Sequence, residues 1–372
     1  MTFWIIFAVI IMAISFLSLF LSDNINKKIL LLGFIFIGII AAFRNNIGAD
    51  YYSYISIAQL ISNSDISVEP SFFWLVSFCD KYNISYRFIF FVYSVLTTFF
   101  IYKGCKAYAK TRERVMSLLL YTFYPYAYWF YMGGLRQGLA ISICFFCTQF
   151  VFSNKKKFIF YILLASLVHY SAIFCLSFLF VSTRKKSIKF VFLCLALSLI
   201  PVFSGATLGE FVNSVLVYVM NAVPGIDSHF LQYTNSTWKG ISAGVIIENV
   251  LFLTIYILYN RIVTDDRDNK DLYKISYFSN LYFIGMILRN MFSSIDAVSR
   301  IGFYFIIFFI IVVPNIMHKV NINLRIVLSF GIYIFFFTYF LYGIYMAQYN
   351  FAASNVNINY EFNIDVINGQ IP

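Results

Sequence analysis

The chain has 372 residues, of which 61% are hydrophobic, 21% aromatic and only 12% charged. Soluble domains are about 45–50% apolar and about 25% charged, so this composition excludes a soluble globular protein. It also excludes a nucleic-acid binder, a disulfide-stapled secreted domain and a disordered chain. The formal net charge of +11 is therefore first a topology signal. We expect an all-α polytopic integral membrane protein.

Apolar runs along the chain predict about twelve transmembrane helical segments. In chain order they are 2–22, 29–43, 86–102, 115–131, 137–153, 158–168, 170–182, 190–203, 241–260, 275–291, 301–317 and 326–346. The pair within 158–182 has basic residues on both flanks, at 155–157 and 184–186. Because basic flanks favour the cytoplasmic side, we predict a short-armed hairpin that reverses near His169.

With the N-terminus outside, 20 of the 27 basic residues lie in cytoplasmic connections. The seven on the outer side are Arg44, Lys81, Arg87, Arg136, Lys239, Arg289 and Arg300. We predict a single transmembrane domain over 1–346, with outer loops at about 44–85 and 204–240. A polar extracytoplasmic tail follows at 347–372. Within the first loop, 66–79 is too short and polar to span, which favours an amphipathic helix on the outer leaflet.

Four outer arginines also lie beside apolar segments, where a charged group is costly unless it is paired or hydrated. They are Arg44, Arg136, Arg289 and Arg300. One such side chain can simply extend to the lipid headgroups, but four on one side favour a functional site. Guanidinium groups match phosphate oxygens in bidentate geometry and stay protonated. We therefore expect an anionic ligand, with pyrophosphate or phosphate as the leading candidate.

Two of these arginines stand in polar or glycine-bearing surroundings. Asp50 follows Arg44 by six residues, with Gly48 between them, which gives an anion binder and a carboxylate, or alternatively a salt bridge that ends a helix. The stretch Gly133-Gly134-Leu135-Arg136 places an arginine in a first helical turn, where backbone N–H groups also favour anions.

His169 lies at the apex of the predicted hairpin, where it is either a satisfied structural donor or an intramembrane functional group. Arg289 and Arg300 are eleven residues apart, which would place them on one face if their helix were unbroken. Asp50 and His169 are the two candidates for a general base. We expect no cofactor and no metal, since no carboxylate cluster suited to Mg²⁺ is visible.

The residues carry a family pattern: Arg44-x-x-x-Gly48-x-Asp50-Tyr51-x-x-Tyr54, Leu135-Arg136-Gln137-x-Leu139-Ala140, His169-x-Ser171-Ala172, and Arg300 leading into Phe303-Tyr304-Phe305. This pattern, over roughly 1–345, resembles the EpsG family of bacterial exopolysaccharide proteins, which are Wzy-like polymerases. The resemblance implies polymerisation of undecaprenyl-pyrophosphate-linked oligosaccharide repeat units on the outer face of the bacterial inner membrane, for O-antigen, capsule or exopolysaccharide synthesis.

Under this hypothesis the four arginines stabilise the departing pyrophosphate, and Asp50 or His169 accepts the proton of the attacking sugar hydroxyl. Candidates for glycan contact within the motifs are Tyr54, Gln137 and Tyr304. The loop 204–240 carries Glu210, Asp227, His229 and Trp238. It either reads the acceptor glycan or is a plain connection.

The expected partners are the lipid-linked oligosaccharide, as both donor and acceptor, membrane lipid, a chain-length regulator and a flippase, with no nucleic acid. The main rival is a flippase or transporter of the same lipid-linked oligosaccharide. Transporters often show two related halves, and no such internal pairing is evident here. A membrane acyltransferase with His169 as base is a third reading, for which the sequence shows no acyl-donor path.

Overall fold

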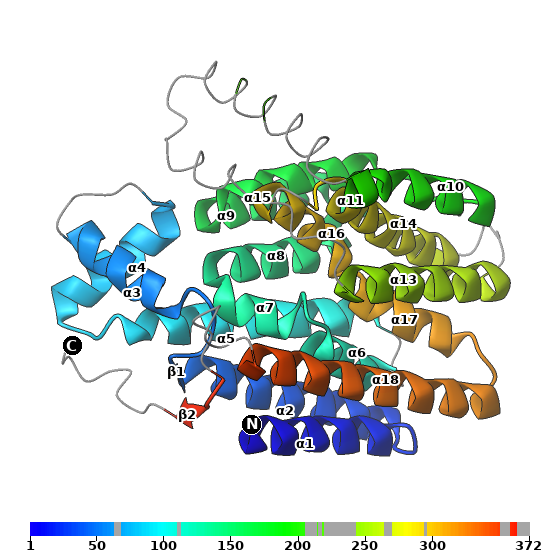
Figure 1. Ribbon diagram of the computed structural model, residues 1–372, viewed down its shortest axis with the longest axis horizontal. Helices are drawn as coiled ribbons and strands as arrows, with labels where there is room; N and C mark the ends of the chain where they lie inside the picture. Colours follow the sequence, from blue (N-terminus) through cyan, green and yellow to red (C-terminus); the bar gives the residue numbers. More distant parts are fainter. Residues whose placement is uncertain are drawn as a thin grey trace. The chain divides into compact units, whose positions relative to one another are not determined.

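A computed structural model describes residues 1–62, 68–109, 113–204, 214, 218, 243–263, 270–293, 296–349 and 358–362. Helices make up most of this part of the chain, and the sheet within it has two strands of two residues each (Figure 1). The predicted helical class is therefore confirmed, and the apolar helices indicate a multi-pass membrane protein. Of the predicted loop 204–240, only Ser204, Ser214 and Tyr218 are described, and its four candidate residues lie outside the described part.

The chain forms two compact units, Met1–Leu179 with Met317–Pro372, and Phe180–Ile316. The first unit contains α1 (Thr2–Ser18), α2 (Asp23–Ala42), β1 (Arg44–Asn45), α3 (Tyr51–Ser62), α4 (Pro70–Tyr82), α5 (Arg87–Tyr108), α6 (Arg114–Phe123), α7 (Tyr128–Gly133), α8 (Leu135–Cys147), η1 (Thr148–Phe150), α9 (Lys155–Val168), α18 (Ile322–Tyr349) and β2 (Glu361–Phe362), and η2 (Tyr170–Phe180) ends at its boundary. The second contains α10 (Ile188–Ser198), α11 (Ile200–Ser204), α13 (Ala243–Ile262), α14 (Lys270–Met291), α15 (Asp296–Ser299), η4 (Arg300–Gly302) and α16 (Phe303–Ile306), with α17 (Phe309–His318) ending at the boundary. The single domain predicted over 1–346 stays a prediction.

In the first unit α5 packs against α2 and α8, α8 packs against α9, and α1 packs against α18. In the second unit α14 is central and contacts α10, α11, α13 and α16. Buried aromatic side chains form much of both interiors, with Trp4 and Tyr121 among them in the first unit and Tyr282 in the second. Within a bilayer such rings stabilise helix contacts mainly through close van der Waals packing, because lipid tails are as apolar as the protein interior.

All twelve predicted ranges overlap helical residues. Five helical segments of the described chain are long and apolar enough to cross a membrane: Asp23–Ala42, Arg87–Tyr108, Ala243–Ile262, Arg300–His318 and Ile322–Gln348. Others are shorter, and the ten residues of α6 extend only about 15 Å at 1.5 Å per residue. A count of twelve spans therefore stays a prediction.

The predicted span 115–131 is broken, and proline chemistry explains the break. Tyr124 precedes Pro125 and adopts extended backbone with ψ of 126°, because the proline ring disfavours helical geometry at the preceding residue. The helix ends at Phe123, and α7 begins at Tyr128. The range 301–317 is also divided, into η4, α16 and α17.

The predicted hairpin around His169 is present. Its first arm α9 begins after Asn154, whose side chain accepts a hydrogen bond from the Lys157 backbone N–H, and it ends where His169 turns to extended backbone. The second arm is the 3-10 helix η2. The rings of Phe158 and Phe178, one on each arm, lie 6.5 Å apart, so the two arms run back along each other from His169.

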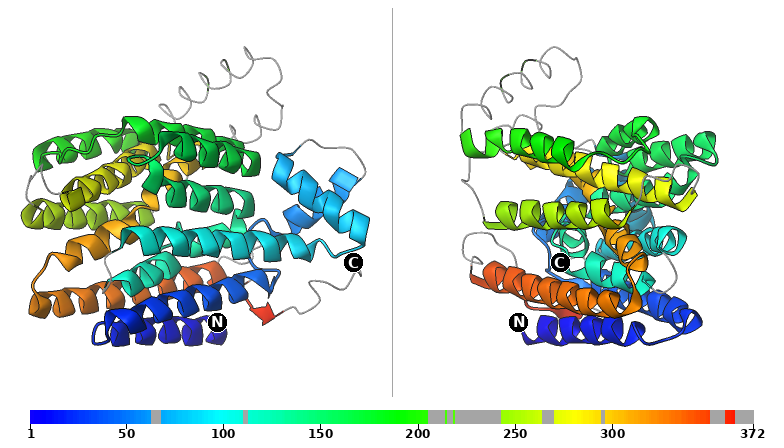
Figure 2. Two further views of the ribbon diagram at one scale, coloured as in Figure 1. Left: turned by 180° about the vertical axis from the view of Figure 1, so that it is seen from behind. Right: turned by 90° about the vertical axis from the view of Figure 1, so that its right-hand side faces the viewer.

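The outer loop predicted at 44–85 is not plain loop, because it contains α3 and α4, which lie beyond one end of α5 (Figures 1 and 2). Pro70 occupies the first turn of α4, and Asn83 ends it in left-handed conformation with φ of 51°. Phe72 and Val76 are buried, whereas Trp74 is 59% exposed. The amphipathic helix predicted at 66–79 is thus confirmed as a helix, and its place on the leaflet stays a prediction.

The predicted tail 347–372 is partly integrated into the fold. α18 extends through Tyr349, and further along the chain β2 pairs antiparallel with β1, with Arg44 opposite Phe362 and Asn45 opposite Glu361. Tyr360 stacks on Phe3 with ring centroids 4.0 Å apart. Residues 358–362 are thus a packed part of the first unit.

Candidate active site

The centre of the site is the carboxylate of Glu69, which the sequence did not single out. Glu69 immediately precedes Pro70 at the start of α4 and is 6% exposed. Its Oε2 accepts a hydrogen bond from Nη1 of Arg136, and its Oε1 lies 2.6 Å from Nδ1 of His169. The contacts span 67 and 100 residues of sequence. One buried acid therefore joins α4, the start of α8 and the apex of the α9–η2 hairpin.

Arg136 lies in the first turn of α8, directly after Gly134 and Leu135. Its guanidinium carbon is 5.5 Å from the centre of the Tyr54 ring and 5.3 Å from that of Phe72. Aromatic faces attract cations at this range, and the side chain remains about one-fifth exposed. The guanidinium is thus fixed by a carboxylate and two rings while part of its surface stays accessible.

The charge of Glu69 determines which nitrogen of His169 carries a proton. Burial raises the pKa of the Glu69 carboxyl, but the hydrogen bond from His169 and the charge of Arg136 outweigh it, and the net pKa is lowered. An ionised carboxylate can only accept hydrogen bonds, so Nδ1 of His169 is the donor. In the neutral ring Nε2 then presents a lone pair, and the side chain is 30% exposed.

Arg44 has a different environment from the one predicted. It is 2% exposed, and its guanidinium donates to the carbonyl oxygens of Ala41, Ile47 (3.0 Å) and Met132 (2.7 Å) and to Oγ of Ser94 (3.0 Å). Burial lowers its pKa to about 10, which leaves it a cation at neutral pH. Four of its five N–H groups are used within the protein, so the geometry favours loop positioning. Its predicted contact with pyrophosphate stays a prediction.

Gly48 explains the spacing of the first motif. Its φ is +110°, and a Cβ there would lie 2.7 Å from the carbonyl oxygen of Met132. The same oxygen accepts the hydrogen bond from Arg44. The loop after α2 therefore approaches the end of α7 too closely for a side chain. The first motif thus contacts Met132, three residues before the second motif begins.

The other candidates in the first unit, Asp50, Tyr54 and Gln137, are buried or half-buried. Asp50 is half-buried before α3, where its backbone oxygen accepts from the Tyr54 N–H. Tyr54 and Gln137 are each 6% exposed. Burial raises the pKa of Tyr54 despite hydrogen bonding and charge from Arg136. The roles of Asp50 and His169 as general base, and the glycan contacts of Tyr54 and Gln137, stay predictions.

In the second unit, Nε of Arg289 donates to Oε2 of Glu248 at 2.8 Å, and Glu248 is 1% exposed. α14 ends at Met291, so Arg289 and Arg300 do not share an unbroken helix. Their elements cross closely instead, because a Cβ on Gly302 would lie 3.0 Å from the Gly285 oxygen.

The remaining second-unit candidates differ in exposure. Arg300 is half-buried, and Tyr304 is fully buried. The predicted binding roles of Arg289 and Arg300, and the predicted glycan contact of Tyr304, stay predictions.

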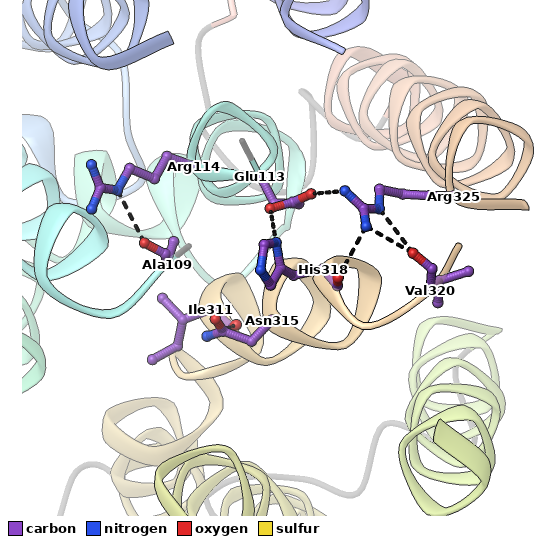
Figure 3. A network of polar contacts seen from close by, with 8 residues as sticks. All are labelled: Ala109, Glu113, Arg114, Ile311, Asn315, His318, Val320 and Arg325. Carbon is purple, nitrogen blue, oxygen red and sulfur yellow. Dashed lines mark hydrogen bonds and ion pairs between the residues drawn. The ribbon is translucent and has the colours of Figure 1, made fainter. Parts of the chain in front are cut away.

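A second Glu–Arg–His cluster lies in the first unit, between the α5–α6 connection and the start of α18 (Figure 3). Glu113 contacts Nδ1 of His318 and Nη1 of Arg325, each at 2.8 Å. Arg325 also donates to the carbonyl oxygens of His318 and Val320. The surroundings of these residues in the sequence do not single them out. Isolated acids beside basic connections look like ordinary solvated charges.

A signal for Glu69 was present in the sequence. It is an acid directly before a proline that opens an apolar helix, in a chain with only 16 acidic residues. Acids are favoured in first helical turns, so this one looked like an ordinary helix start. Only the fold shows that Arg136 and His169, which are distant in the sequence, share it.

The protein-family model described as the EpsG family matches residues 27–362. No curated protein and no solved structure matches the chain.

Proposed function

The chain belongs to the EpsG family, and we propose from this premise that it is a polysaccharide polymerase that joins undecaprenyl-pyrophosphate-linked oligosaccharide repeat units. Family membership itself supports a polymerase-like role. The lipid carrier and the reaction on the outer face of the bacterial inner membrane are parts of the proposal. The placing of only seven of 27 basic residues on the outer side in the predicted topology supports this orientation.

The observation that carries the proposal is the buried carboxylate of Glu69 with Arg136 and His169 on its two oxygens. Such a cluster combines a fixed cation with an oriented imidazole. A glycosyl transfer from a lipid pyrophosphate needs both, since the leaving group gains negative charge while the attacking hydroxyl loses a proton.

In the proposed step, a hydroxyl oxygen of one glycan forms a bond to the anomeric carbon of the other. The bond from that carbon to the pyrophosphate oxygen breaks, and its electron pair leaves with the lipid pyrophosphate. Nε2 of His169 takes the hydroxyl proton, while Glu69 stabilises the resulting imidazolium. Arg136 stabilises the departing pyrophosphate, which a preorganised guanidinium does more strongly in a water-poor site than in bulk water.

The remaining parts of the proposal concern partners and topology. Both donor and acceptor are lipid-linked oligosaccharides, and a chain-length regulator and a flippase are expected partners. About twelve membrane segments carry the chain through the bilayer. Arg289 and Arg300 are further candidates for pyrophosphate binding.

Purified protein in bilayers, given a lipid-pyrophosphate-linked repeat unit as its sole substrate, tests the function. We expect a ladder of glycans that differ by one repeat unit, with one lipid pyrophosphate released for each new bond. Transbilayer movement of the substrate without a ladder would support the flippase alternative and contradict the polymerase.

A further inference from the structure

The strand β2 pairs with β1, which carries Arg44. Arg44 and Asn45 follow directly after α2, whereas Glu361 and Phe362 come from beyond α18. Asn45 also donates from Nδ2 to the Glu361 carboxylate at 2.9 Å. A ladder of two residues is too short to hold by itself, so further contacts must keep the segment 358–362 in place.

Those contacts come from the ends of α1 and α2. The fully buried indole of Trp4 donates from Nε1 to the Ile358 oxygen at 2.7 Å, and the Tyr360 hydroxyl donates to the Ile40 oxygen at 3.0 Å. The Phe362 ring stacks on Phe43 with centroids 5.1 Å apart. Two hydrogen bonds and one ring contact thus fix residues 358–362 against α1 and the end of α2.

A continuous set of contacts leads from this segment to the candidate active site. β2 holds the backbone of Arg44, and the Arg44 side chain donates to the oxygen of Met132. Met132 is four residues before Arg136, across the glycine-containing junction of α7 and α8. The backbone at Gly48 also lies close to the same Met132 oxygen.

We propose that residues 358–362 act as a positioning strap, which fixes the loop 44–50 against the α7–α8 junction and thereby sets the place of Arg136. Tyr360 and Trp4 are its positioning residues. The effect on catalysis rests on the proposed function, whereas the effect on the loop does not. Removing the strap frees the backbone groups of β1 and loosens the support of Arg44, while the helices that carry Glu69 and His169 keep their own packing.

The test uses the full chain in bilayers, with Trp4→Phe and Tyr360→Phe, which each remove one hydrogen-bond donor and keep a ring. Tyr342→Phe is the matched control, because Tyr342 is a 50% exposed tyrosine on α18. A chain that ends at Tyr349 removes the strap entirely, and a synthetic peptide of residues 350–372 is added back to it.

Hydrogen exchange of residues 44–50 and 130–136 is the first readout. Each single variant should raise it about two- to tenfold, as expected for one lost hydrogen bond. The truncated chain should show a larger rise that the peptide reverses. Hydrogen exchange in α13 should not change in any variant. Hydrogen exchange of residues 44–50 and 130–136 should not change in Tyr342→Phe. Unchanged exchange at 44–50 after truncation would overturn the strap.

Glycan synthesis is the second readout. The truncated chain should need a higher concentration of lipid-linked substrate for half-maximal rate, and the peptide should restore the wild-type value. Faster exchange with unchanged synthesis would overturn the link to Arg136. Faster exchange in a protein whose wild type makes no glycan would uphold the strap and overturn the polymerase instead.

Discussion

The first unit contains two clusters of the same composition, Glu69 with Arg136 and His169, and Glu113 with Arg325 and His318. They differ in how the arginine is used. Arg325 donates to backbone carbonyl oxygens as well as to its acid, so it closes a chain turn (Figure 3). The described partners of Arg136 are side chains, namely a carboxylate and two aromatic rings.

The composition of a cluster alone therefore does not identify a reactive site. A guanidinium whose N–H groups bind backbone oxygens is part of the scaffold. One that is held by side chains and stays partly exposed can add a ligand. By this criterion Arg44 belongs with Arg325, although the sequence placed it with Arg136.

Substitutions of the two arginines should give the largest difference in glycan synthesis between the clusters. Arg136→Ala should lower the rate of glycan synthesis about 10²- to 10³-fold, as for loss of one transition-state donor. Arg136→Lys should restore little of it, because an ammonium cannot bind phosphate in bidentate fashion. The measurement is product formation at saturating substrate, with Arg325→Lys as control. Full activity in Arg136→Lys would instead indicate a side chain that only reaches the headgroups.

Exchanging each acid for its amide should also distinguish the two clusters. Glu69→Gln should lower kcat about ten- to a hundredfold, as is typical when an orienting partner is lost, with a smaller change in KM. The dependence of kcat on pH should also change in Glu69→Gln, because the imidazolium formed in the reaction loses its counter-charge. Glu113→Gln should leave kcat close to wild type. Equal losses in the two variants would contradict the distinction.

The second cluster should matter for stability. Glu113→Gln removes the carboxylate that His318 and Arg325 share, and a lost charged hydrogen bond typically costs about 1–3 kcal/mol. Thermal unfolding in detergent should therefore begin at lower temperature than in the wild type. An unchanged unfolding curve would show that the cluster contributes little to the fold.

The smallest expected effect is on the pH dependence of stability. The pKa of Glu69 is lowered in the fold, so its contribution is complete above the ordinary value of about 4.3 and disappears as pH falls through the lowered value. The difference in melting temperature between wild type and Glu69→Gln should therefore narrow in that acidic range. Parallel curves from pH 7 downward would be inconsistent with an ionised Glu69.

The sequence allowed the helical class, the hairpin and the interest of Arg136 and His169, two members of the Glu69 cluster, to be predicted. Arg136 and His169 stood out because charged or titratable groups are rare beside apolar segments. Pro125 should have ended a helix, but the aromatic run around it concealed the break.

The role of Arg44 was not accessible in the same way. It depends on the Met132 oxygen, 88 residues away, and spacing along the chain does not encode such a contact. Glu69 resembled a normal helix start for the same reason, because its two partners come from other helices.

The most direct test of the reaction centre compares His169→Ala with His318→Ala in bilayers supplied with the lipid-linked repeat unit. We expect His169→Ala to lose about 10²- to 10⁴-fold in bond formation, the usual contribution of a general base, while it still binds the substrate. His318→Ala should retain the wild-type glycan ladder. A full ladder from His169→Ala would contradict a general-base role for His169.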